Sequence, residues 1–174
     1  MGLTSYFSVI PNIKGYSFVE LVEMDYKLKT SPIAVPHEIQ PYINNVGTSP
    51  RLSLNIGKWD KGYMIHDWME YESSYGQGQR GEQIVNDTEI VTILEVIDEF
   101  LRLILTTGFE DTRLTMGKRL KSKTFDAMGR THFFSTAQNN EEYYNELILT
   151  RMILKEALNK YPEDDYHKYF ESYQ

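Results

Sequence analysis

The sequence predicts a single α+β domain over residues 1–174, with a small antiparallel sheet from the N-terminal half packed by three main helices. Two observations support this fold class. Short segments of the N-terminal half alternate apolar and polar residues with period two, which is typical of half-buried strands. Two longer segments later in the chain repeat apolar residues at the spacing of an amphipathic helix. The length also fits one domain, since domains of roughly 100–200 residues are usual.

The first residues predict a β-hairpin. Residues 6–10 form a short apolar strand, residues 11–15 contain the Pro, Asn and Gly that favour a turn, and residues 18–28 alternate with period two. A third short strand is expected over residues 51–56, where the alternation returns. The aromatic residues within 131–135 are typical of one more strand.

A proline-rich insertion is expected over about residues 31–50. Its prolines are Pro32, Pro36, Pro41 and Pro50. Proline fixes φ and removes a backbone donor, so this segment has no room for a long regular element. We expect at most one turn of helix there, over residues 37–44.

Two helices have clear sequence signatures, over about residues 87–107 and 140–160. Asn86 and Asn139 each precede a Glu by three positions, which is the arrangement of a helix capping box. The apolar residues that follow each cap recur at helical spacing and predict a buried stripe. The acidic and aromatic tail over residues 163–174 is expected to add one further helical turn.

The third expected helix is the tryptophan-bearing segment over about residues 58–71. Its two neighbouring stripes at helical spacing are formed by Lys61, Ile65 and Trp68, and by Trp59, Tyr63 and His66. Two tryptophans on different sides of one helix are difficult to bury in one core. We therefore expect one flank to pack inward and the other to line a pocket or an interface, with burial of both rings as the competing interpretation.

Composition excludes several classes of site. The chain has no cysteine, which removes disulfides, thiolate metal sites and cysteine nucleophiles. Its four histidines are widely separated and match no metal-ligand spacing, so we expect no metal and no cofactor. No run approaches the roughly 20 apolar residues of a membrane span, and no signal peptide is recognisable, so we expect a cytoplasmic protein. Residues 76–81 match the glycine fingerprint of dinucleotide-binding folds but lack its strand-to-helix context, and we interpret them as a loop.

A basic segment interrupts an acidic chain. It contains Lys118, Arg119, Lys121 and Lys123, whereas the formal net charge of the whole chain is -7. The local positive field suits a phosphate or a nucleotide, and a solvated face or a counter-charge for the acidic C-terminal helix is the competing interpretation. The negative net charge disfavours duplex DNA as the main partner, because phosphate neutralisation dominates such binding. It is compatible with a protein partner that carries a basic nucleic-acid-binding surface.

Three motifs together resemble a family of small uncharacterised phage and prophage proteins. They are the Met-Gly-Leu start at residues 1–3, the run of residues 57–68, and the Phe-Phe-Ser-Thr of residues 133–136 ahead of the final helix. The positions that match the family's central motif are Trp59, Lys61, Ile65, His66 and Trp68. Asp60 stands where the family has Arg, and Tyr63 where it has Asn, which removes a cation and an amide from any anion site on that helix. The resemblance covers nearly the whole chain apart from the insertion, and it implies a phage origin.

Our first functional hypothesis is a non-catalytic phage accessory protein that binds and inhibits a host protein in the host cytoplasm, for example as a counter-defence (anti-CRISPR-like) inhibitor. It is motivated by the resemblance, by the acidic balance and by the lack of a catalytic motif. The alternative is a binder or sponge of a nucleotide signal, since aromatic stacking combined with cations suits a nucleotide. A small hydrolase with His66 as general base is a further alternative. The candidate ligand- or partner-binding residues are Trp59, Lys61, Tyr63, His66, Trp68, Lys118 and Arg119.

Overall fold

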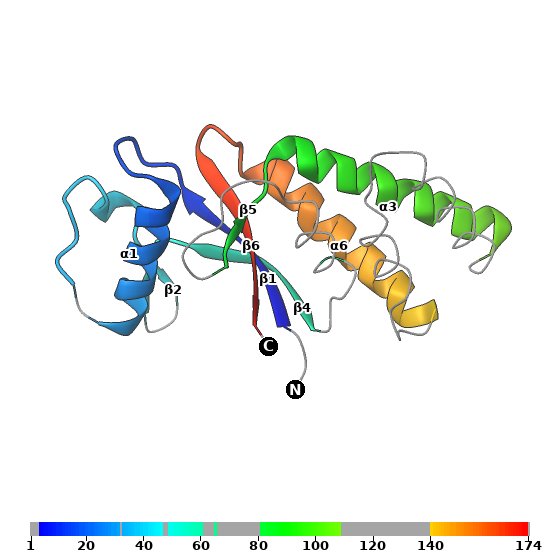
Figure 1. Cartoon of the computed structure of the whole chain (residues 1–174), viewed down its shortest axis with the longest axis horizontal. Helices are drawn as coiled ribbons and strands as arrows, with labels where there is room; N and C mark the ends of the chain where they lie inside the picture. The colour runs from blue at the N-terminus through cyan, green and yellow to red at the C-terminus, as the bar shows by residue number, and fades with distance from the viewer. Residues whose placement is uncertain are drawn as a thin grey trace.

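The two ends of the chain lie side by side in the middle of a four-stranded antiparallel sheet (Figure 1). Strand β1 (Thr4–Pro11) pairs along its whole length with β6 (Tyr166–Tyr173). The outer strands are β4 (Leu54–Asp60), which pairs with β1, and the short β5 (Gln83–Ile84), which pairs with β6. This computed structural model describes residues 4–31, 33–46, 49–60, 65, 81–108 and 140–173.

Three α-helices of the described residues cover the two faces of this sheet. Helix α1 (Phe18–Thr30) packs on one face, and α3 (Asp87–Thr107) and α6 (Asn140–Lys160) lie side by side on the other (Figure 1). The predicted α+β class is thereby confirmed, as are the helices expected over residues 87–107 and 140–160. Strand β6 comes from the C-terminal end of the chain, so the N-terminal half does not form the sheet alone.

The capping box predicted for α3 is present. The Asn86 side chain accepts a hydrogen bond from the Glu89 backbone N–H at 2.8 Å, and the Glu89 carboxylate accepts one from the Asn86 backbone N–H at 2.9 Å. Two backbone donors of the first turn are satisfied in this way, and the helix begins at a defined residue. The cap expected at Asn139 and the strand expected over residues 131–135 lie outside the described residues.

The expected strand over residues 18–28 is wrong, because this segment is helix α1. A capping box at Ser17 and Glu20 starts the helix, with 2.7 Å between the Ser17 backbone nitrogen and the Glu20 carboxylate. The buried side chains recur at helical spacing and are Phe18, Leu21, Asp25 and Leu28. A buried face of this kind decides between helix and strand when period two and period 3.6 both fit a short run.

The expected helix over residues 58–71 is wrong for its first residues, because Leu54–Asp60 is strand β4. Gly57 of this strand lies so close to α6 that a Cβ at this position would collide with the side chain of Ile153. The tail is also a correction, since Tyr166–Tyr173 forms strand β6 where a helical turn was expected. Residues 61–71 of the expected helix lie outside the described residues, except for the buried Ile65.

The proline-rich residues 31–50 pack against α1. They contain the expected turn of helix, a 3-10 turn labelled η1 (Gln40–Tyr42), and they lead into a small hairpin of β2 (Asn44–Val46) and β3 (Ser49–Arg51). The fully buried Ile39 anchors them in the core beneath α1. The strand expected over residues 51–56 is divided, because β3 ends at Arg51 and β4 begins only at Leu54.

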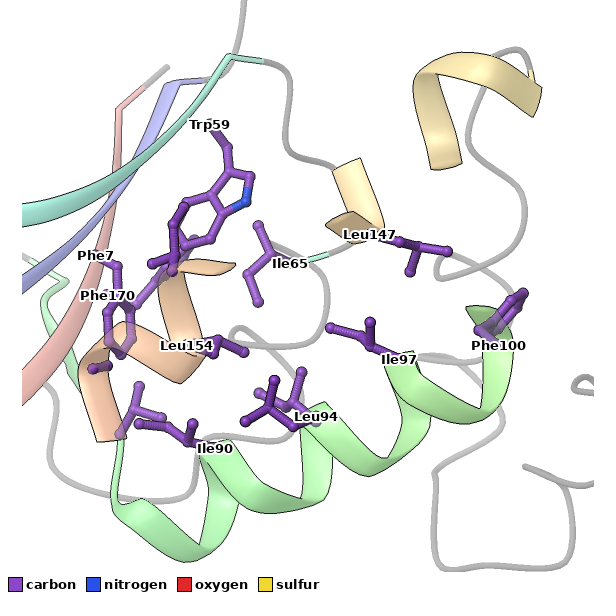
Figure 2. Close-up of a cluster of buried hydrophobic side chains, with 14 of the residues drawn as sticks. Phe7, Trp59, Ile65, Ile90, Leu94, Ile97, Phe100, Leu147, Leu154 and Phe170 are labelled. Atoms are coloured by element: carbon purple, nitrogen blue, oxygen red, sulfur yellow. The ribbon is translucent and has the colours of Figure 1, made fainter. Parts of the chain in front are cut away.

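Two separate hydrophobic cores result, one on each face of the sheet. The larger core joins α3 and α6 to the sheet, and Figure 2 shows its strand-borne aromatic rings, Phe7, Trp59 and Phe170, beside the apolar side chains of the two helices. The smaller core lies between α1, residues 31–50 and the opposite face of the sheet. None of the described helices is both long enough and apolar enough to cross a membrane.

Candidate functional site

Trp59 is the predicted site residue that falls within the described part of the chain, and it lies in the larger core. Its side chain is 1% exposed, and its indole N–H donates a hydrogen bond to the Thr150 hydroxyl of α6 at 2.9 Å. The ring packs edge-on against Phe7 with 6.5 Å between ring centroids. Both the apolar body and the polar atom of Trp59 are therefore satisfied inside the protein, and the ring is not presented to solvent.

The other predicted site residues lie outside the described residues. They are Lys61, Tyr63, His66, Trp68, Lys118 and Arg119. Their position relative to Trp59 therefore lies outside what the structure describes, and the nucleotide-binding and hydrolase hypotheses that depend on them stay predictions.

The face of the sheet that carries α1 has a strip of aromatic and charged side chains close to the chain ends. Cross-strand pairing places Lys58, Tyr6 and Glu171 in one row across β4, β1 and β6. The next row toward the termini contains Asp60 and Tyr173. We call these five residues the open strip. The strand ends that carry it lie beside the two termini in Figure 1.

Helix α1 covers the same face farther from the termini. Its first residue, Phe18, packs edge-on against His167 and Tyr169, at ring-centroid distances of 5.7 and 5.4 Å. The open strip continues this face of β6, because residues of a strand alternate between the two faces of the sheet. Exposure rises along the strand in the same direction: Tyr169 is buried, Glu171 is partly buried and Tyr173 is 58% exposed.

Buried Asp25 of α1 stands at the border of the open strip. Its carboxylate accepts hydrogen bonds from the backbone N–H groups of Leu52 and Ser53 at 2.7 and 2.9 Å, and from the Ser53 hydroxyl at 2.7 Å. The ammonium of Lys29 lies 2.7 Å from the same carboxylate. These bonds join α1 to the residues between β3 and β4, and they explain why the expected strand over residues 51–56 is interrupted there.

The pKa of Asp25 reflects this full set of partners. Burial alone would raise the pKa, but the hydrogen bonds from Lys29 and Ser53 outweigh it and hold the pKa of Asp25 below its ordinary value. Asp25 is therefore ionised at neutral pH. It is a structural carboxylate whose hydrogen-bonding capacity is used within the protein.

Glu171, the central residue of the open strip, is in the opposite situation. Its carboxylate accepts a hydrogen bond from the Tyr173 hydroxyl at 2.8 Å, and no cationic side chain of the described residues forms an ion pair with it. Burial raises the pKa of Glu171 above its ordinary value, and the hydrogen bond from Tyr173 and the charge of Lys29 offset this only in part. The neighbouring charges of Glu82 and Asp25 raise it further.

Glu82 is brought next to Glu171 by the register of β5. Ile84 pairs with Tyr169 and Gln83 pairs with Phe170, so the residue before β5 comes opposite Glu171 on the same face. The side chain of Glu82 is also buried, with 5% of the residue exposed. The negative charge of Glu82 beside Glu171 disfavours ionisation of the Glu171 carboxyl.

Two tyrosines are neighbours of Glu171: Tyr6 is its pairing partner on β1, and the Tyr173 hydroxyl donates a hydrogen bond to it. Tyr6 and Tyr173 meet edge to face with 5.9 Å between their ring centroids. Burial and the charge of Glu171 raise the pKa of the Tyr173 phenol well above its ordinary value, so that the hydroxyl remains protonated and donates to Glu171. A carboxylate beside electron-rich ring faces is an environment that attracts a cation.

The hydrogen-bonded pair of Tyr173 and Glu171 is not arranged as a nucleophile and its base. The described residues contain no group of three or more His, Asp and Glu side chains arranged to hold a metal ion. The nucleophile-and-base arrangement of covalent catalysis requires a hydroxyl or thiol hydrogen-bonded to a general base. The Tyr173 hydroxyl bonded to Glu171 has its pKa raised rather than lowered, which is the wrong direction for a nucleophile.

Sequence reasoning missed all three central residues of the open strip, Tyr6, Glu171 and Tyr173. A signal was present in the tail, because Tyr166, Tyr169 and Phe170 are residue types that strands favour. The juxtaposition itself had no local signal, since it depends on the pairing of β1 with β6 from opposite ends of the chain.

Comparison with known proteins gives no further guide to this site. No family model, no curated protein and no solved structure matches the chain.

Proposed function

We propose that the chain is a non-catalytic accessory protein encoded by a phage, which binds a host protein in the host cytoplasm and inhibits it. A component of host defence is the target class that we favour, which would make the protein a counter-defence inhibitor of the anti-CRISPR kind. The observation that carries this proposal is the open strip, where exposed Tyr173 and charged Lys58 and Asp60 surround the partly buried Glu171.

The composition of the open strip is that of a protein-binding surface. Tyrosine is enriched at interfaces, because its ring supplies a large rigid contact at a low entropy cost and its hydroxyl keeps a polar partner. Tyr173 meets both conditions, since its ring contacts Tyr6 and its hydroxyl bonds to Glu171. The ion pair of Lys58 with Asp60, 3.0 Å apart and exposed, supplies a charged rim.

The acidic character of the protein supports a basic partner. The formal net charge of -7 steers association with positively charged surfaces, including those with which host proteins bind nucleic acid. A protein that covers such a surface inhibits its owner without any catalysis.

The test is an affinity capture from host lysate with the tagged full-length protein and two variants. Tyr173→Ala removes an exposed ring of the open strip, and Tyr42→Ala removes a ring of similar exposure on η1 as the matched control. We expect the wild type and the control to recover one host protein in stoichiometric amount, and Tyr173→Ala to recover at least tenfold less, the loss typical of an interface hot spot. Equal capture by Tyr173→Ala, or no stoichiometric partner with any form, contradicts the proposal.

A further inference from the structure

We propose that the open strip holds an arginine side chain from a basic segment of the partner, with the guanidinium bonded to the Glu171 carboxylate beside the ring of Tyr173. This inference rests on the proposed function and adds the chemistry of the recognised group. It is carried by an imbalance of charge and by the aromatic rings around it.

The imbalance is visible residue by residue. The charges of Asp25 and Glu82 act on the partly buried carboxylate of Glu171 on this face of the sheet. The ammonium of Lys29 lies 2.7 Å from Asp25, and that of Lys58 lies 3.0 Å from Asp60. Lys29 and Lys58 are therefore each paired with another carboxylate, and Glu171 is left without an ion pair to a cation of the described residues, so it can accept an additional positive charge. Binding a cation opposite a partly buried carboxylate relieves the unfavourable burial of negative charge.

The rings favour a guanidinium over an ammonium. The Tyr173 hydroxyl bonds to Oε2 of Glu171, which leaves Oε1 as acceptor for an incoming donor. A guanidinium is planar, is weakly hydrated and stacks on aromatic faces while its N–H groups bond in their plane to a carboxylate. An ammonium is more strongly hydrated and lacks the planar face, so it gains less from Tyr6 and Tyr173.

The charge pattern also favours a protein segment over a nucleic acid. The open strip presents two acidic side chains, Glu171 and Asp60, with Glu82 beside them, and a phosphate backbone would be repelled by them. A basic peptide segment is attracted by the same groups.

The experiment uses short capped peptides as probes and the full-length protein as receptor. The peptides alternate glycine with arginine, with lysine or with glutamate, and binding is measured by calorimetric titration at neutral pH. The variants are Glu171→Gln, which keeps the shape and removes the charge, and the control Glu38→Gln, which removes an exposed charge outside the strip. We expect the arginine peptide to bind wild type and Glu38→Gln alike, Glu171→Gln to bind it about tenfold more weakly, and the lysine peptide to bind wild type several-fold more weakly.

Each outcome distinguishes this inference from the proposed function. Equal binding of the arginine peptide by Glu171→Gln and Glu38→Gln would show attraction by net charge alone and would overturn the inference, even if a host partner is captured. Equal binding of the arginine and lysine peptides would overturn the choice of arginine. Selective, Glu171-dependent arginine binding without any captured host protein would support the inference and count against the proposed function.

Discussion

The two faces of the central sheet use their buried polar groups in different ways. On the face covered by α3 and α6, the two largest buried polar side chains are paired within the protein: the Trp59 indole bonds to Thr150, and the buried Lys168 ammonium lies 2.6 Å from the Asp87 carboxylate. The small uncharged Ser5 hydroxyl and the Gln83 amide oxygen are buried on the same face without a hydrogen-bond partner among the described residues. On the face covered by α1, Asp25 is paired in the same way. Glu171 has one neutral donor instead, in a setting that raises its pKa.

This difference separates groups that stabilise the fold from a group that is free to bind. A buried polar atom that is fully paired contributes to stability and specificity of folding, and its removal leaves its partners unsatisfied. A carboxylate kept partly buried with incomplete compensation costs stability, as groups at binding sites often do. The comparison therefore predicts that substitutions on the first face change stability alone, whereas substitutions at Glu171 change binding and raise stability.

The largest expected effect on stability is at Trp59, on the face covered by α3 and α6. Trp59→Ala removes the largest fully buried side chain of the described residues and leaves a cavity beside α6, which we expect to lower the free energy of unfolding by about 4 kcal/mol. Trp59→Phe keeps an apolar ring but deprives the Thr150 hydroxyl of its donor, and we expect a loss of about 2 kcal/mol. Urea denaturation followed by circular dichroism measures both.

The Trp59→Phe variant also tests the assignment of function. We expect it to bind the arginine peptide with the affinity of the wild type, because its ring does not face the open strip. A tenfold loss of peptide binding in a folded Trp59→Phe protein would connect the two faces and break the comparison.

The next effect is expected at Asp25, on the α1 face. Asp25→Asn keeps the shape of the side chain but removes the charge of a carboxylate that accepts three hydrogen bonds and pairs with the Lys29 ammonium. We expect it to lower the free energy of unfolding by about 2 kcal/mol. Because the folded pKa of Asp25 is lowered, its contribution is present above its ordinary pKa of 3.8 and is lost as the pH falls through the folded value. Unfolding curves of wild type and Asp25→Asn should therefore converge in acid. A constant difference down to the acid transition would contradict this account.

The sequence was sufficient where an element is stabilised by its own residues. Helix α3 carries its cap at Asn86 and its apolar stripe in one continuous segment, so both its bounds and its buried face follow from spacing. Helix α1 carries a cap of the same type at Ser17, but its short run also fits period two, and only packing on the sheet decides between the two.

Elements stabilised by distant residues were not predictable in this way. Strand β6 is a strand because β1, at the other end of the chain, provides its hydrogen-bonding partner. Trp59 lies in a strand because β4 pairs with β1, and Gly57 of the same strand permits the close approach of Ile153 from α6; no local pattern encodes either contact. The open strip combines both problems, since Tyr6 and Glu171 become neighbours only through the register of that pairing.

The smallest expected effect, and the one that most sharpens the comparison, is the pH dependence at Glu171. A folded pKa above the ordinary value means that folding favours the protonated form of the Glu171 side chain. The contribution of this group to the free energy of unfolding is therefore fully present below its ordinary pKa of 4.5 and is lost as the pH rises through the folded value. Glu171→Gln should therefore be more stable than wild type by about 1 kcal/mol at neutral pH, with the difference vanishing below the ordinary pKa.

The groups that face Glu171 set the limits of this test. They are Asp25 and Lys29 of α1, Tyr6 of β1, Lys58 of β4, Tyr173 of β6 and Glu82 before β5. Of these, Asp25 has a lowered folded pKa, so its contribution to the slope of stability with pH has the opposite sign and lies at lower pH. Thermal unfolding of wild type, Glu171→Gln and the exposed control Glu38→Gln across this range measures the difference. A Glu171→Gln protein that is less stable than wild type at neutral pH would show that the fold already supplies a cation to Glu171, and the arginine would then have no place on the strip.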